Sequence, residues 1–294
     1  MRSKGRIVKA VSGFYYVYSH GSPLRQCRAR GIFKLQELTP LVGDYVTFSA
    51  VGDNDGIIES IDERVSQLIR PSVANIDQVI LVFSLLEPPI TYYQLDKMIA
   101  MIERQRLPLI LAFTKADLPG ADAVYDAVSV VYAALYPVLK TSVESEIGMV
   151  ELGTHLFGKT SAIAGISGVG KSSLLRYLIP EALVETGEVS KRSLRGRHTT
   201  RHVELFFWHD GYILDTPGFS QFSFANVEPI EVQEMFRDIL TLANQCEFRG
   251  CLHESEQGCM VREAYEKNSL PPSRYQSYLH LLAEVKQLKV RRYT

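Results

Sequence analysis

The sequence lacks the features of a membrane-bound or secreted protein. No run of about 18 apolar residues, the length needed to cross a bilayer, occurs in its 294 residues. The basic start, Met1 to Ile7, is not followed by the apolar stretch of a signal peptide. We therefore expect a cytoplasmic protein with no membrane partner.

Charge of one sign is not in excess either. Lys and Arg number 32 against 33 for Asp and Glu, which gives a formal net charge of -1 at pH 7. This composition excludes attraction of nucleic acid over the whole surface, so any RNA contact must come from local basic patches. Two such patches contain Arg25, Arg28, Arg30 and Lys34 near Tyr15, Tyr16 and Tyr18, and Lys286, Lys289, Arg291 and Arg292.

Cysteine is scarce, but three of the 4 cysteines lie close together. Disulfide pairing within this group would leave one spare thiol, which favours a metal site. With a nearby histidine, the three thiolates form the ligand set of a closed tetrahedral Zn²⁺ site, which leaves no position open for catalysis. The alternative is three buried cysteines beside an unrelated histidine. We predict one structural Zn²⁺ bound by Cys246, Cys251, His253 and Cys259.

The length and the apolar content of 46% allow two or three domains. Short β-branched runs separated by turn residues predict a small all-β barrel before residue 69. The continuous apolar run 78–84 indicates a strand buried on both faces of a parallel sheet. Further strands are expected at 107–113 and 160–164, and helices at 91–103 and 121–135.

This alternation of strands and helices is typical of a doubly wound α/β domain. After it, helices are predicted over 229–243 and 273–288. We expect three domains, comprising residues 1–69, 70–222 and 223–294.

A phosphate-binding loop lies between a predicted strand and a predicted helix. It fits the pattern G-x-x-x-x-G-K-[ST] and consists of Gly165, Ile166, Ser167, Gly168, Val169, Gly170, Lys171, Ser172 and Ser173. The glycines let backbone N–H groups surround phosphates, and the helix N-terminus adds partial positive charge. Lys171 is predicted to reach the β- and γ-phosphates, and the Ser172 hydroxyl to bind Mg²⁺.

A second phosphate motif follows further along the chain. Asp215-Thr216-Pro217-Gly218 has the form D-x-x-G at the end of a predicted strand. There the Asp215 carboxylate can hold Mg²⁺ through water, and the Gly218 N–H can contact the γ-phosphate.

The base-recognition motif precedes both phosphate motifs. Thr114-Lys115-Ala116-Asp117 resembles the N-K-x-D motif of GTPases. A buried Asp117 carboxylate would accept hydrogen bonds from guanine N1–H and N2–H₂, which adenine lacks, and the Lys115 stem would stack over the base. Thr114 replaces the usual asparagine. Ser142 and Val143 resemble the start of the following S-A-K motif.

The motifs therefore occur in permuted order, with the base motifs before the phosphate motifs. A parallel sheet tolerates this because strands are ordered in space and termini can be cut into exposed loops.

Between the two phosphate motifs lies a polar stretch that we interpret as switch I. Thr199 or Thr200 would bind Mg²⁺ and the γ-phosphate, and the alternative is a solvated basic loop. Hydrolysis of a nucleotide requires a side chain that orients the attacking water, and Ras-type enzymes have a glutamine for this directly after the D-x-x-G motif. Phe219 occupies that position here and cannot form hydrogen bonds through its ring, so we hypothesise that His198 orients the water.

Together these motifs resemble the ribosome small-subunit-dependent GTPase A family, which is circularly permuted. The resemblance spans essentially the whole chain, and the departure is Arg201, where the family usually has a third threonine. It implies an N-terminal OB-fold barrel, a permuted P-loop GTPase domain and a helical zinc-binding domain. It also implies GTP hydrolysis stimulated by the 30S subunit during its late assembly, with Mg²⁺ as cofactor and 16S rRNA as a contact.

Two other functions are compatible with these motifs. A P-loop small-molecule kinase would need a substrate pocket with its own acid or base, and the sequence offers no obvious one. An RNA-binding module with a regulatory or vestigial nucleotide site is disfavoured because Lys171, Ser172 and Asp215 are all present. We expect a monomer.

Overall fold

The structure is a computed structural model that describes residues 2–35, 38–69, 71–180, 203–216 and 224–292. Its contacts divide the chain into two compact units. The first contains residues 1–79, 151–164 and 171–219, and the second contains residues 80–150, 165–170 and 220–294. Among the described residues, no helix is both long enough and apolar enough to span a bilayer.

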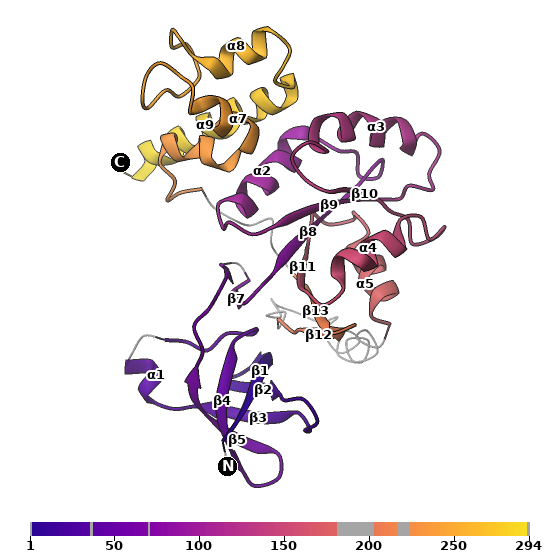
Figure 1. Cartoon of the computed structure of the whole chain (residues 1–294), viewed down its shortest axis with the longest axis vertical. Coiled ribbons are helices and arrows are strands. Elements are labelled where there is room, and N and C mark those ends of the chain that lie inside the picture. The colour runs from indigo at the N-terminus through magenta and orange to yellow at the C-terminus, as the bar shows by residue number, and fades with distance from the viewer. Residues whose placement is uncertain (1, 36–37, 70, 181–202, 217–223, 293–294) are drawn as a thin grey trace. The chain divides into compact units, whose positions relative to one another are not determined.

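The N-terminal part is a closed barrel, as predicted (Figure 1). Its strands are β1 (Arg2–Val11), β2 (Phe14–Tyr18), β3 (Arg25–Ala29), β4 (Tyr45–Val51) and β5 (Asp55–Ile61). They close in the order β1-β2-β3-β5-β4, with β3 and β5 parallel and α1 (Ile32–Leu35) between β3 and β4. Alternate residues of a strand point to the same face, and one face of each strand lines the interior of the barrel. Three side chains on these inner faces are 0% exposed, namely Ile7, Val17 and Ile58.

Beyond the barrel come β6 (Gln67–Leu68) and β7 (Val73–Ala74), which form a two-stranded sheet. A six-stranded sheet follows in the order β10-β9-β8-β11-β13-β12. Its strands are β8 (Gln78–Ser84), β9 (Leu109–Thr114), β10 (Val138–Lys140), β11 (Thr160–Ala164), β12 (Phe206–Trp208) and β13 (Gly211–Asp215).

Parallel pairing joins β10 to β9 and β11 to β13, whereas β12 pairs antiparallel with β13. Every residue of β8 is buried, which confirms the prediction from its apolar run, and the strands expected at 107–113 and 160–164, observed as β9 and β11, are buried throughout as well. The carboxyl ends of parallel strands lie at one edge, so in the second unit the loops that follow β9 and β10 begin side by side.

Two helices of this region match those predicted over 91–103 and 121–135, one begins at Lys171 as expected, and one over 149–156 was not predicted. They are α2 (Tyr92–Glu103), α3 (Ala121–Tyr132), α4 (Met149–Leu156) and α5 (Lys171–Leu178). In the second unit, α2 packs on β9 and α3 on β10 (Figure 1).

The C-terminal part is helical, with η2 (Pro229–Met235), α7 (Arg237–Ala243), α8 (Met260–Glu266) and α9 (Pro272–Arg292). The single helix predicted over 229–243 is wrong, because the chain breaks at Phe236, which is extended with φ −127° and ψ 98°. In this extended conformation the Phe236 side chain is 1% exposed, and its burial offsets part of the cost of interrupting the helix. The last helix was predicted correctly and runs a few residues further than expected.

Candidate functional site

The phosphate loop has the backbone that its glycines predict. Gly168 and Gly170 have φ of 83° and 94°, values that residues with a Cβ rarely adopt. A Cβ on Gly165 would lie 2.3 Å from the carbonyl oxygen of Val82 on β8, so this position has no room for a side chain. The loop is therefore a close-packed backbone cradle of the kind that fits a phosphate chain.

The base loop and the phosphate loop meet within the second unit. Thr114, the last residue of β9, lies with its Oγ1 2.5 Å from the carbonyl oxygen of Val169. Lys115, with φ 59°, directs its ammonium to the carbonyl oxygen of Glu87, a partner that the sequence did not indicate. Motifs more than 50 residues apart along the chain, at 114 and 169, are thus in direct contact.

Asp117 and Ser142 form the second pair at this site. The buried Ser142 hydroxyl donates to Oδ1 of Asp117 over 2.5 Å, and the amide of Ala116 donates to the carbonyl oxygen of Thr141. Asp117 is exposed in the structure, whereas the sequence analysis expected a buried carboxylate. An exposed carboxylate is accessible to a ligand, and the Ser142 hydroxyl fixes one of its two oxygens. Val143 follows Ser142 and is half-buried.

Asp215 ends β13 in the first unit. It pairs with Ile163 on β11, two residues before Gly165. Thr216 anchors this end, because its hydroxyl donates to the carbonyl oxygen of Ile163 over 2.8 Å. Lys171 and Ser172 open α5, with Ser172 exposed together with Ser173. A carboxylate and a serine hydroxyl are oxygen ligands of the kind that Mg²⁺ prefers.

Four predicted site residues lie outside the described residues. They are His198, Thr199, Thr200 and Gly218. Their roles stay predictions.

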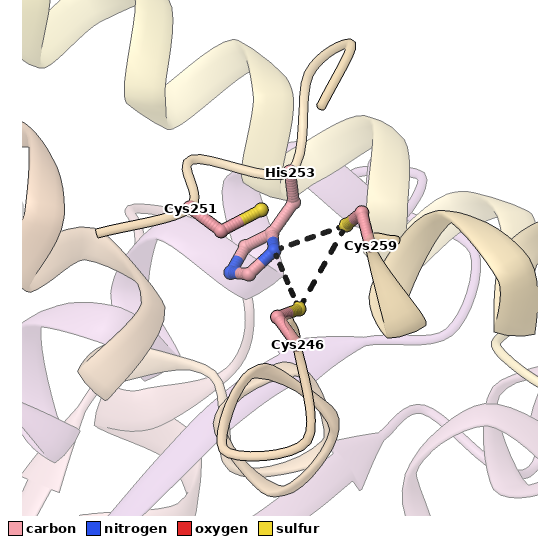
Figure 2. A group of neighbouring side chains, drawn as sticks. All are labelled: Cys246, Cys251, His253 and Cys259. Atoms are coloured by element: carbon pink, nitrogen blue, oxygen red, sulfur yellow. Dashed lines mark hydrogen bonds between the residues drawn. The ribbon is translucent and has the colours of Figure 1, made fainter. Parts of the chain in front are cut away.

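The metal cluster is assembled as predicted (Figure 2). The ligand atoms of Cys246, Cys251, His253 and Cys259 all lie within 4.8 Å of one another. Nδ1 of His253 is 3.7 Å from Sγ of Cys246 and 3.3 Å from Sγ of Cys259, and the two sulfurs are 4.0 Å apart. A tetrahedral Zn²⁺ site requires about 3.8 Å between sulfurs and about 3.6 Å from sulfur to nitrogen. These three residues therefore fit zinc with small adjustments.

The surroundings of the cluster also suit a metal. The Nε2 atom of His253 lies 2.8 Å from Oε1 of Gln233. Donation to that oxygen fixes the tautomer and leaves the Nδ1 lone pair toward the sulfurs. Burial raises the pKa of Cys251 to about 12 and lowers the pKa of His253. The Cys251 thiol therefore keeps its proton at neutral pH, and a bound cation would displace it. Sequence analysis missed Gln233, because an isolated glutamine on another helix carries no spacing signal.

The two basic patches differ in the structure. In the barrel, the Arg28 guanidinium lies 4.7 Å from the ring centroid of Phe14, and Arg25 donates to the carbonyl oxygen of Asp53 over 2.8 Å. On α9 the charges are largely neutralised by Glu254 and Glu228. The ion pairs are Lys286 with Glu254 at 2.5 Å, and Lys289 and Arg292 with Glu228 at 2.5 and 3.7 Å.

Comparison with known proteins agrees with this site. The profile of the RsgA GTPase family matches residues 61–225, and that of the RsgA N-terminal domain matches residues 4–58. The chain is 46% identical over 293 residues to the small ribosomal subunit biogenesis GTPase RsgA of Shouchella clausii (strain KSM-K16), with 99% of each chain covered. It is 40% identical over 296 residues to the protein of that name from Bacillus subtilis (strain 168), covering 98% of this chain and 99% of that protein.

Two solved structures share the fold. One is YloQ, described as a circularly permuted GTPase, with a TM-score of 0.83, 37% identity and coverage of 98% of this chain and 96% of that one. The other is YjeQ from Thermotoga maritima, with a TM-score of 0.83, 34% identity and coverage of 97% and 99%. The permuted motif order predicted from the sequence is thus confirmed, and the chain belongs to the RsgA family of GTP-hydrolysing enzymes.

Proposed function

We propose that this GTPase acts in late assembly of the small (30S) ribosomal subunit and that the subunit stimulates its hydrolysis of GTP. The observation that carries the proposal is the contact of the base loop with the phosphate loop through Thr114 and Val169. It supports one nucleotide spanning both motifs despite their permuted order. The names of the relatives, small ribosomal subunit biogenesis GTPases, support the partner.

In this proposal each site residue has one task. Asp117, held by Ser142, accepts hydrogen bonds from the guanine edge. The amides of 165–170 and the ammonium of Lys171 bind the phosphates of GTP or GDP. Ser172 and Asp215 would hold Mg²⁺, together with Thr200 or Thr199, and the ion would neutralise charge on the β- and γ-phosphates.

Catalysis is proposed to depend on the segment before β12. His198 would orient the attacking water, and Thr199 or Thr200 and Gly218 would contact the γ-phosphate. Histidine is suited to this because its neutral ring accepts a proton near pH 7. The 30S subunit would order this segment and so increase the rate.

The appended parts would bind the ribosomal partner. The barrel patch with Arg28 and Phe14 offers a cation and an aromatic ring for contact with 16S rRNA. A zinc ion held by the cysteine and histidine cluster would tie together the loops of the C-terminal part. We also propose a cytoplasmic location, which a ribosomal partner would support. The monomeric state and the three domain boundaries stay predictions.

GTP turnover with and without purified 30S particles tests the proposal. We expect a large stimulation by the particles, and we expect His198→Ala to lose it while nucleotide affinity stays the same. Turnover that requires a small acceptor molecule would instead indicate a kinase. Binding of RNA without any turnover would indicate a vestigial nucleotide site.

A further inference from the structure

We propose that Thr114 ties the phosphate loop to the base loop with its single hydroxyl proton, and that it therefore donates nothing to the N7 atom of guanine. Base recognition by this chain would then depend on the guanine edge that faces Asp117. The proposal rests on the nucleotide site proposed above and names how that site discriminates.

The hydroxyl of Thr114 faces backbone carbonyls. Its Oγ1 lies 2.5 Å from the carbonyl oxygen of Val169 and 3.2 Å from that of Phe83. A threonine hydroxyl has one proton to donate, and carbonyl oxygens only accept. The proton therefore goes to the nearer oxygen, that of Val169. Val169 is 0% exposed and Thr114 is 5% exposed, so water does not easily replace this bond.

The rest of the Thr114 side chain also packs against the phosphate loop. A Cβ on Gly170 would lie 3.5 Å from Oγ1 of Thr114 and 3.7 and 3.8 Å from its Cβ and Cγ2. The tight contact of Gly165 with Val82 holds the other end of the loop. The loop is thus fixed at both ends, and Thr114 fixes the end next to Lys171.

Counting donors shows what a threonine at this position changes. An asparagine carboxamide has two N–H donors, so it could bond the Val169 oxygen and keep one donor for the base. Threonine has none left over. Guanine presents N7 and O6 as acceptors and N1–H and N2–H₂ as donors, and Asp117 can use only the donors.

A thermodynamic cycle between Thr114→Val and loss of N7 tests this directly. The probes are GDP and 7-deaza-GDP, in which a C–H replaces N7, bound to the full-length protein with Mg²⁺. Valine keeps the shape of threonine but leaves the Val169 oxygen without its donor. We expect Thr114→Val to weaken both ligands by about tenfold, the loss typical of an unmet buried hydrogen bond. The two factors should agree within about twofold.

Three variants sharpen the result. Thr114→Ser keeps the hydroxyl and should restore most of the affinity. Thr114→Asn adds a donor and should make GDP bind about fivefold better than 7-deaza-GDP. The matched control is Tyr125→Phe, which removes a hydroxyl that bonds the Val138 carbonyl oxygen over 3.1 Å instead of the phosphate loop. It should change GDP affinity by less than about threefold.

The outcomes separate the two proposals. A cycle in which Thr114→Val weakens GDP by over fivefold more than 7-deaza-GDP would show that the hydroxyl contacts N7, and would overturn this inference alone. Equal affinity of the Thr114→Val variant and the unchanged protein for GDP would also overturn it. If the unchanged protein bound no GDP, the nucleotide site itself would be wrong.

Discussion

Replacing Arg274 should detach α9 from α2 in the second unit. The Arg274 side chain is 0% exposed and reaches two carboxylates on two other helices. It donates to Oδ1 of Asp96 on α2, and its Nε and Nη2 lie 2.8 and 2.7 Å from the two oxygens of Asp238 on α7. Its guanidinium also lies 4.8 Å from the ring centroid of Phe236. One side chain therefore bonds three helices together.

The expected cost follows from the burial of its partner. Arg274→Met keeps much of the side-chain volume but removes the cation beside Asp96, which is 0% exposed and keeps only neutral hydroxyl partners, Tyr132 at 2.8 Å and Ser277. Removing one member of a buried ion pair typically destabilises a protein by about 3–5 kcal/mol. Adding Asp96→Asn removes the buried carboxylate charge that has lost its partner. The double variant Arg274→Met, Asp96→Asn should therefore be more stable than Arg274→Met alone.

The pH dependence gives a second readout. Burial raises the pKa of Asp96, and the Arg274 guanidinium opposes that shift. Without Arg274 the pKa should rise further. An aspartate whose pKa is raised in the folded state binds a proton more tightly when folded than when unfolded. As the pH falls toward about 3.9, the pKa of an unfolded aspartate, the variant should therefore lose less stability than the unchanged protein. The double variant has no such group and should not show this recovery.

Amide hydrogen exchange of α2 and α9, followed by mass spectrometry, measures the opening free energy of these helices without assuming that the whole protein unfolds in one step. The matched control is Lys286→Met, which breaks an exposed ion pair between α9 and Glu254 and should cost less than about 1 kcal/mol of stability. The reasoning fails if Arg274→Met costs no more than this control, or if Asp96→Asn gives no rescue.

Three further predictions concern other parts of the chain. Asp117→Asn should change the base preference from guanine to xanthine, because the asparagine amide donates a hydrogen bond where xanthine has an oxygen in place of the guanine amino group. Calorimetry with XDP and GDP measures this, and a variant that still prefers GDP would contradict it. Glu256→Ala should weaken zinc binding by about tenfold in a competition with a chelator. The Glu256 carboxylate accepts hydrogen bonds from the backbone N–H groups of Leu252, Glu254 and Ser255, which lie between the cysteines. The control is Glu266→Ala, on the surface of α8, which should bind zinc normally. Arg6→Met should lower the melting temperature by several degrees, since it removes the donors to Gly43, Asn75 and Thr160, and a melting curve equal to that of Lys4→Met would contradict this.

Much of the site could be predicted because its chemistry is local in sequence. The phosphate loop needs glycines at fixed spacing, and the cluster of Cys246 to Cys259 spans few enough residues to be seen as a unit. The apolar runs of β8 and β9 predicted buried strands because a strand covered on both faces has no polar alternation. Such signals need no knowledge of the tertiary fold.

What sequence reasoning missed comes from contacts between distant segments. Gln233 is a single glutamine on a short helix, and only the fold brings it to His253. The basic patch on α9 is an ordinary run of charges until the fold supplies Glu228 and Glu254 as partners. The break at Phe236 accompanies the burial of its side chain among residues that are distant in sequence, and the helical preference of its neighbours gives no sign of it.

The start of the chain shows most clearly why distant contacts are decisive. In the sequence, Arg6 and Lys9 are two charges in a basic N-terminal strand, where solvent exposure is the natural expectation. In the first unit, Arg6 is 4% exposed and lies 4.7 Å from the ring centroid of Tyr212, three residues before Asp215. The pairing of β1 with β2 shifts between Ile7 and Lys9, and the Val8 carbonyl oxygen accepts the amide of Leu205 over 2.8 Å.

A bulge of this kind re-aims a backbone group away from its own sheet. Here it provides an acceptor for the segment that leads into β12, and Lys9 adds an ion pair with Glu204 at 2.8 Å. One barrel strand therefore bonds both to β13, which ends at Asp215, and to the residues just before β12. No periodicity within residues 2–11 encodes this, because each partner lies about 200 residues away and becomes a neighbour only when both segments are folded.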